Sequence, residues 1–210
     1  TQTQILNTTI GAFGEQQFAW RDRLYVTAAL RVDNNSAFGD DFKWVTYPKV
    51  SASWVLNEED FWTFDNTIQT LRLRAAYGAS GRQPNAFAAL RTFTPVTGPT
   101  GGTAVTPGSL GNPDLKPEVG KELELGFETG MFNRLSIDFT YFTKSTKDVI
   151  VSQAVAPSAG FPGQQFRNIG EVSNSGVEVA GTLQALQRRN YSWEITGKVS
   201  TNKDQIESLG

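Results

Sequence analysis

The segment Leu135-Ser136-Ile137-Asp138-Phe139-Thr140-Tyr141 places apolar or aromatic side chains at odd positions and polar ones at even positions. A period of two predicts a β-strand with one apolar face and one polar face. Six further segments show this alternation: 24–33, 47–56, 71–77, 122–129, 176–183 and 191–200. An eighth segment, residues 5–20, alternates poorly and its phase cannot be fixed. About eight strands follow, most of them near the roughly 9–11 residues with which a tilted strand crosses a bilayer.

The links between these strands alternate in length. Residues 21–23, 130–133 and 185–190 are short links, and residues 57–69 form a medium link in which one helical turn is expected over 58–64. The other three links are long: 34–45, 80–117 and 148–171. Transmembrane barrels have short turns at one end and long loops at the other. The sequence therefore predicts an all-β chain whose antiparallel strands belong to a transmembrane β-barrel.

The cost of exposing charge to lipid assigns the two faces. A charge facing lipid at the bilayer midplane costs about 2–4 kcal/mol, so the charged face of each strand should line the lumen. The charged residues expected there are Arg72, Arg74, Glu122, Glu124 and Asp138. We expect Arg72 and Arg74 to pair with Glu122 and Glu124 in a cross-strand ion ladder. Aromatic girdles are expected near both membrane surfaces, with Tyr47, Tyr77 and Tyr141 toward the long-loop end.

Composition excludes several classes of function. The 210 residues contain no Cys and no His, which removes disulfides, Cys nucleophiles, His bases and Cys/His zinc sites. The formal net charge of −2 gives no basic footprint for nucleic acid. We therefore expect neither an enzyme nor a cofactor. No metal site is assigned, although the loop carboxylates Asp40 and Asp41 leave that question open.

One motif carries a family resemblance. Asn112-Pro113-Asp114-Leu115-Lys116-Pro117-Glu118 follows a long Gly/Pro loop, opens a strand, and resembles the signature of TonB-dependent outer-membrane transporters. Segments 31–39, 47–54, 71–81, 133–138 and 168–178 are similar to the SusC/RagA subgroup of that family. We expect the motif to be structural, because its two prolines preset the backbone and Asp114 can accept hydrogen bonds in an Asx turn.

The resemblance implies that this chain is part of a larger transporter. Residues 1–210 would be a section of about eight strands from a 22-stranded plugged barrel, without the plug, TonB box or signal peptide in this chain. It implies active import of an oligosaccharide or peptide through the bacterial outer membrane, coupled to TonB-ExbB-ExbD and capped by a SusD-like surface lipoprotein. The alternatives are a self-contained eight-stranded barrel acting as an anchor or adhesion module and a soluble β-sandwich carbohydrate-binding protein.

Aromatic and basic residues in the long links are the candidate ligand contacts. We expect these side chains to be exposed on outward loops, where exposed apolar rings indicate a binding surface. An equally weighted alternative is that the rings tuck back into the loops or pack against a lid partner. The candidates are Phe38, Trp44, Arg82, Phe87, Phe93, Phe161, Phe166 and Arg167.

Overall fold

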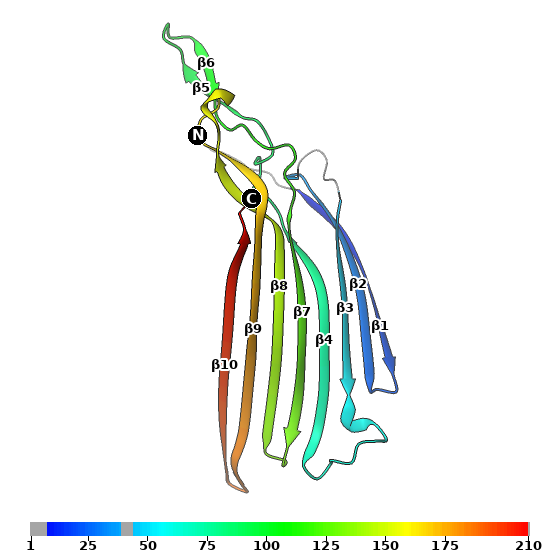
Figure 1. Ribbon diagram of the computed structural model, residues 1–210. Coiled ribbons are helices and arrows are strands. Elements are labelled where there is room, and N and C mark those ends of the chain that lie inside the picture. Colours follow the sequence, from blue (N-terminus) through cyan, green and yellow to red (C-terminus); the bar gives the residue numbers. More distant parts are fainter. Residues whose placement is uncertain (1–7, 39–43, 210) are drawn as a thin grey trace.

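The computed structural model describes residues 8–38 and 44–209, and shows a tall antiparallel sheet of eight strands (Figure 1). Its order along the sheet is β1-β2-β3-β4-β7-β8-β9-β10. The strands are β1 (Thr9–Trp20), β2 (Leu24–Asn35), β3 (Val45–Val55), β4 (Ile68–Arg82), β7 (Glu118–Met131), β8 (Leu135–Ala154), β9 (Gln164–Arg188) and β10 (Tyr191–Ser208). Each strand pairs with its neighbour in this meander, which confirms the predicted all-β antiparallel architecture.

The eight-stranded sheet is open. In the described part of the chain, β1 pairs only with β2 and β10 pairs only with β9. The closed eight-stranded barrel is therefore wrong for this structure. The sandwich is also wrong, because the second sheet consists only of the hairpin of β5 (Phe93–Thr97) and β6 (Thr103–Pro107).

Strand register sorts the two faces of the sheet into continuous rows. One row crosses all eight strands with apolar side chains: Trp20, Leu24, Trp54, Leu73, Phe127, Phe139, Val179 and Val199. The next row, on the opposite face, is largely polar or small: Ala19, Tyr25, Ser53, Arg74, Gly126, Thr140, Glu178 and Ser200. We call the first surface the apolar face and the second the charged face.

The tight connections lie at one end of the sheet (Figure 1). Arg21 and Asp22 join β1 to β2, and Phe132 and Asn133 join β7 to β8, all four with φ between 51° and 57°. Positive φ at both central residues is the type I′ geometry, which matches the twist of a hairpin. The medium link contains a 3-10 turn at Leu56–Glu58 in place of the helical turn expected over residues 58–64.

The long-loop end departs most from the sequence predictions. The link expected over residues 148–171 is mostly strand, because β8 continues to Ala154 and β9 begins at Gln164, with the short turn η2 (Pro157–Ala159) between them. The long link after β4 contains the β5–β6 hairpin, which projects beyond the sheet (Figure 1).

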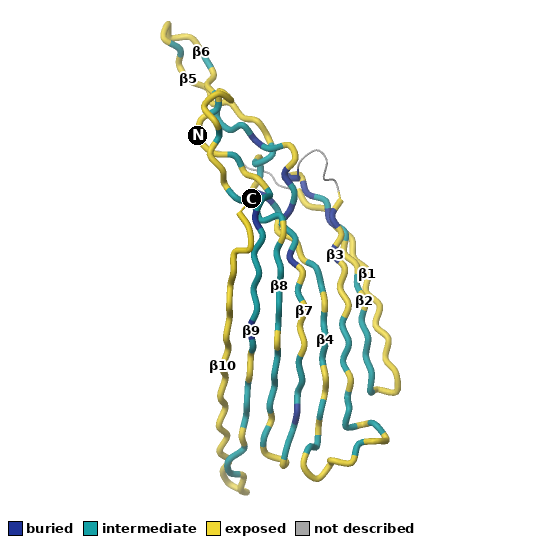
Figure 2. Tube along the Cα trace, in the orientation of Figure 1, coloured by how far each residue is buried: buried dark blue, intermediate teal, exposed yellow. Residues whose placement is uncertain are grey.

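The small core lies at the long-loop end, where Figure 2 shows most of the buried residues. Phe38, Val45 and Tyr47 form one cluster, which Ala79 joins. Leu115 and Pro117 are the largest fully buried side chains. Tyr47 shares the charged face with Arg31, its register partner, so its assignment to a lipid-facing girdle is wrong. Tyr77 and Tyr141 lie on the apolar face, opposite Leu123 and Leu125.

Candidate functional site

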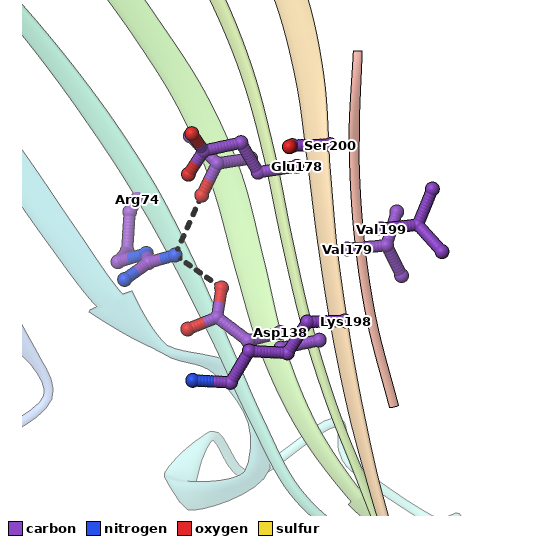
Figure 3. A pocket seen from close by; sticks show the side chains of 9 residues that line it. Arg74, Asp138, Glu178, Val179, Lys198, Val199 and Ser200 are labelled. Carbon is purple, nitrogen blue, oxygen red and sulfur yellow. Dashed lines mark hydrogen bonds and ion pairs between the residues drawn. The ribbon is translucent and has the colours of Figure 1, made fainter. Parts of the chain in front are cut away.

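Arg74 is the centre of an ion-pair network on the charged face. Its guanidinium lies 2.9 Å from the Glu128 carboxylate and 2.6 Å from that of Asp138, and it donates to the Thr140 hydroxyl at 3.1 Å. Arg72 joins the network at 3.6 Å from Glu128. The network links three strands, because Arg74 lies on β4, Glu128 on β7, and Asp138 and Thr140 on β8. Figure 3 shows the Arg74 guanidinium pointing toward the Asp138 carboxylate.

The carboxylates in this network differ from the ones expected. Register places Arg72 opposite Glu128, whereas Glu124 lies opposite Ala76 and Glu122 opposite Gly78. Glu122 pairs instead with Lys144 of β8 at 3.5 Å. The expectation that Arg72 and Arg74 pair with Glu122 and Glu124 is therefore wrong. Sequence alternation shows which face a residue shares, but it does not show how far one strand is shifted along the next.

A hollow of about 510 Å³ adjoins this network on the charged face. Besides Arg74, Asp138 and Thr140 it is lined by Glu178, Lys198 and Ser200, and Figure 3 shows these side chains around one open space. Both signs of charge and two hydroxyls are present. Such a surface can hold polar or charged groups through ion pairs and hydrogen bonds.

The Asn112–Glu118 motif is held by a side chain from β9. Asn168 accepts a hydrogen bond from the backbone N–H of Lys116 at 2.9 Å and donates to the carbonyls of Lys116 at 2.9 Å and Asp148 at 2.8 Å. Glu118 accepts from the N–H of Ile150 at 2.9 Å. The motif therefore docks onto the β8–β9 extension, as a structural element would.

Within the motif, Asn112 forms the Asx turn. Its side-chain oxygen accepts from the N–H of Asp114 at 3.2 Å, while the Asp114 side chain is exposed. The role expected for the Asp114 side chain therefore belongs to Asn112. Pro113 is exposed and Pro117 is fully buried beside Leu115, which anchors the loop where it enters β7.

Two of the loop aromatics meet. The rings of Phe93 and Phe161 lie 5.7 Å apart between centroids, and the Arg91 guanidinium lies 5.3 Å from the Phe161 centroid. Phe93 lies on β5, Phe161 lies between η2 and β9, and Arg91 lies in the loop between β4 and β5. Phe93 keeps 54% of its surface exposed. A cation–π contact and two rings therefore form a small aromatic cluster at the long-loop end.

Phe38 does not belong to this surface. Its side chain is only 8% exposed and packs with Val45 and Tyr47, so the expectation that it is exposed is wrong. Loop position alone does not show whether a ring faces water or the top of the sheet. The other candidates are exposed and separate: Trp44, Arg82, Phe87, Phe166 and Arg167.

Two asparagines hold the loop end together. Besides Asn168, the buried Asn35 donates to Thr9 and to Gln83, each at 2.6 Å, and accepts from the N–H of Ala37 at 2.7 Å. Both side chains link backbone or side-chain groups far apart in sequence. Both asparagines lie in segments, 31–39 and 168–178, that resemble the SusC/RagA subgroup, so the resemblance was the signal that could have found them.

Neither a metal cluster nor a helical membrane span is found in the described residues. Within 8–38 and 44–209, no group of three or more Asp, Glu, His or Cys side chains could hold a metal ion, and Asp40 and Asp41 lie outside those ranges. No helix among the same residues has the length and apolar character needed to cross a membrane.

Comparison with known proteins decides the family. The family model described as TonB dependent receptor-like, beta-barrel matches residues 1–208. The chain belongs to this family. The predicted resemblance is thereby confirmed, and with it an integral β-barrel of the outer membrane in a family of receptors and transporters that are not enzymes.

Two TonB-dependent receptors are similar to this chain in sequence. TonB-dependent receptor P26 of Formosa agariphila is 32% identical over 203 residues, which are 94% of this chain and 20% of that protein. TonB-dependent receptor SusC of Bacteroides thetaiotaomicron is 26% identical over 97% of this chain and 21% of its own length. The chain thus spans about a fifth of the length of these relatives.

Solved structures agree on the fold. The RagAB peptide transporter matches with a TM-score of 0.88 at 21% identity, over 97% of this chain and 22% of that chain. A siderophore receptor, PirA from Pseudomonas aeruginosa, matches with a TM-score of 0.61 at 19% identity, over 95% of this chain and 35% of that one. The higher score places the sheet geometry nearer to the SusC/RagA type, as the motifs had predicted.

Proposed function

We propose that this chain forms part of the wall and outer loops of a TonB-dependent importer that moves a large nutrient, an oligosaccharide or a peptide, across the outer membrane. The observation that carries the proposal is the two-faced sheet. Its apolar row spans all eight strands, whereas the opposite face holds the Arg74 network. A charge facing lipid at the midplane costs about 2–4 kcal/mol. The charged face, including Arg72, Arg74, Glu122, Glu124 and Asp138, then lines the lumen.

The loop aromatics are the proposed first contact with the nutrient. Phe93, Phe161 and Arg91 combine one exposed ring, that of Phe93, and one half-buried ring, that of Phe161, with a guanidinium. Rings with nearby hydrogen-bond donors suit sugars and peptides alike, because both expose apolar patches beside polar groups. Further exposed candidates lie in or beside the long connections: Trp44, Arg82, Phe87, Phe166 and Arg167.

The partners proposed for the complete protein follow from the same family. A SusD-like surface lipoprotein would close the long-loop end, where the projecting β5–β6 hairpin offers the exposed Val96 and Val105. Energy would come from a TonB-ExbB-ExbD complex, through parts of the receptor other than these strands. Outer-membrane lipid would cover the apolar face.

Growth of a deletion strain tests the import proposal. Cells lacking the full-length gene would be grown on a panel of oligosaccharides as carbon source and of peptides as nitrogen source. We expect the deletion to abolish growth on at least one nutrient, and the wild-type gene to restore it. Growth equal to wild type on every member of both panels would contradict import.

Paired variants then test the aromatic cluster. The double variant Phe93→Ala with Phe161→Ala should slow uptake of the nutrient at limiting concentration, because both ring faces are lost. Phe64→Ala is the control, since Phe64 is comparably exposed, at 57%, in the link between β3 and β4. Unchanged uptake and unchanged lipoprotein capture in the double variant would remove the cluster from both the binding and the lid interpretations.

A further inference from the structure

A second hollow of about 510 Å³ lies on the charged face at the long-loop end, between β2, β3 and β4. The residues that matter there are Arg31 and Asp33 from β2, Tyr47 from β3, and Arg82 with Gln83 at the end of β4. None of these belongs to the Arg74 network or to the aromatic cluster. The hollow is therefore a separate site.

Its floor is fixed by packing. Tyr47 is 9% exposed and packs with Phe38 and Val45. Its phenol lies over Gly81, where an added Cβ would clash with the hydroxyl oxygen and the ring. A residue larger than glycine at position 81 would thus displace the ring. The close fit holds the floor in one arrangement before any ligand arrives.

Arg31 is oriented by Asp33 and still has donors to spare. The Nε of Arg31 donates to both carboxylate oxygens of Asp33 at 2.9 Å. The Asp33 side chain is 8% exposed, whereas that of Arg31 is 62% exposed. Within residues 8–38 and 44–209, the two terminal nitrogens of Arg31 have no acceptor. Asp33 therefore acts as a positioning residue that leaves the guanidinium fork facing the hollow.

Arg82 supplies a second guanidinium. It is exposed and has no acceptor among the residues that the structure describes. Glu118 is its register partner on β7, but an oxygen of that carboxylate accepts from the N–H of Ile150. Gln83 is held by Asn35, which donates to its side-chain oxygen at 2.6 Å and so leaves the Gln83 amide nitrogen as a donor.

The charges of the side chains that line the hollow indicate the charge of the ligand it can bind. Among the residues that line the hollow, Arg31 and Arg82 contribute two positive charges and Asp33 one negative charge. Glu118 lies beside Arg82 on β7 but outside the lining, and one of its carboxylate oxygens accepts from Ile150. The lining therefore carries a net positive charge with several unused N–H donors. Guanidinium groups recognise carboxylate and sulfate oxygens through paired hydrogen bonds. We propose that this hollow binds an anionic group of the imported nutrient. The inference rests on the proposed import function and narrows its substrate to molecules that carry a carboxylate or similar anion.

Matched probes test the charge requirement and its source. The detergent-solubilised full-length receptor would be titrated calorimetrically with a tripeptide bearing a free C-terminal carboxylate and with its amide. A trigalacturonate and its methyl ester form the second pair. We expect one anionic probe to bind at least about tenfold more tightly than its neutral partner, the scale of one charge-assisted hydrogen bond. The pair that shows the difference identifies a peptide or a sugar acid as the source.

Variants locate the effect. Arg82→Gln and Arg31→Gln should each reduce that preference by about tenfold, while Arg188→Gln, at the tight-turn end of β9, should leave it unchanged. Equal or absent binding in both pairs, or a preference unaltered by Arg82→Gln and Arg31→Gln, overturns the inference. Loss of growth in the deletion strain together with such a result would leave import standing and remove only the anion site.

Discussion

Replacing Asn168 with Ala should release the Asn112–Glu118 motif from the β8–β9 extension. The side chain makes three hydrogen bonds of 2.8–2.9 Å, all to backbone groups of Lys116 and Asp148. A typical hydrogen bond contributes about 0.5–1.5 kcal/mol net. Three of them give roughly 1.5–4.5 kcal/mol. The local opening equilibrium should therefore rise between about 10-fold and 2,000-fold.

Hydrogen exchange of the full-length receptor measures this directly. Backbone amides of residues 112–120 and 146–152 should exchange faster in Asn168→Ala by a factor in that range, because local opening limits their exchange. Amides in the middle of β4 and β7 should keep their protection. Asn168→Asp should have an intermediate effect, since it retains the acceptor for the Lys116 N–H and loses both donors.

Asn174→Ala is the matched control. Asn174 lies on the same strand and also donates side-chain hydrogen bonds, but to Asn202 and Asp204 of β10. Its removal should leave exchange in residues 112–120 unchanged. If exchange there is the same in Asn168→Ala as in wild type, Asn168 does not hold the motif and the reasoning is refuted.

Three further predictions concern the sheet. Arg74→Met should lower the free energy of unfolding of the full-length barrel in urea by roughly 1 kcal/mol, because Arg74 bridges two carboxylates within 2.9 Å. Arg72→Met should lower it by less than about 0.5 kcal/mol, because Arg72 approaches one carboxylate at 3.6 Å. Urea unfolding midpoints equal to that of wild type would show that the network adds nothing to stability. Gly176→Ala should reduce the heat-modifiable folded band on gels, since an added Cβ would meet the Thr201 carbonyl, whereas Gly197→Ala meets nothing within 4 Å and should fold as wild type. Gly81→Ala should displace the Tyr47 ring and slow uptake, whereas Gly14→Ala should not, because nothing lies within 4 Å of a Cβ added at Gly14. Identical uptake by the two variants would show that the Tyr47 floor is dispensable.

The alternation of side chains predicted the strands because a membrane wall penalises any error in it. A charged residue such as Asp138 would meet lipid if it lay on the apolar face. The period of two is therefore strict wherever one face of a strand meets lipid and the other meets water. The same cost explains why the phase of β1 could not be fixed from the sequence. Phe13 lies on the charged face opposite Arg31, while Phe18 and Trp20 lie on the apolar face, so aromatic rings occur on both faces of this strand. An apolar ring in the lumen carries no comparable penalty.

Register and loop structure were beyond the sequence for a different reason. Pairing Arg72 with Glu128 rather than Glu122 depends on how β4 and β7 slide past each other across a link of more than thirty residues, which no local pattern encodes. The burial of Phe38 and the hydrogen bonds of Asn168 depend on contacts that only the assembled loop end creates. The β5–β6 hairpin was obscured by Pro95 and Pro107, which lower strand propensity.

The length of β9 explains how the long-loop end is anchored without a large core. Its 25 residues extend for about 80 Å at roughly 3.3 Å per residue, or about 60 Å along a barrel axis at a tilt near 40°. Since the apolar band of such barrels is only about 25 Å tall, much of the β8–β9 hairpin must stand outside the lipid, where both faces meet water. Alternation is lost there for that reason, yet ladder hydrogen bonds continue to Ala154 and Gln164. The Asn112–Glu118 motif docks on this extension through Asn168, so the loop that carries the exposed Phe93 is anchored to the ladder of the wall itself.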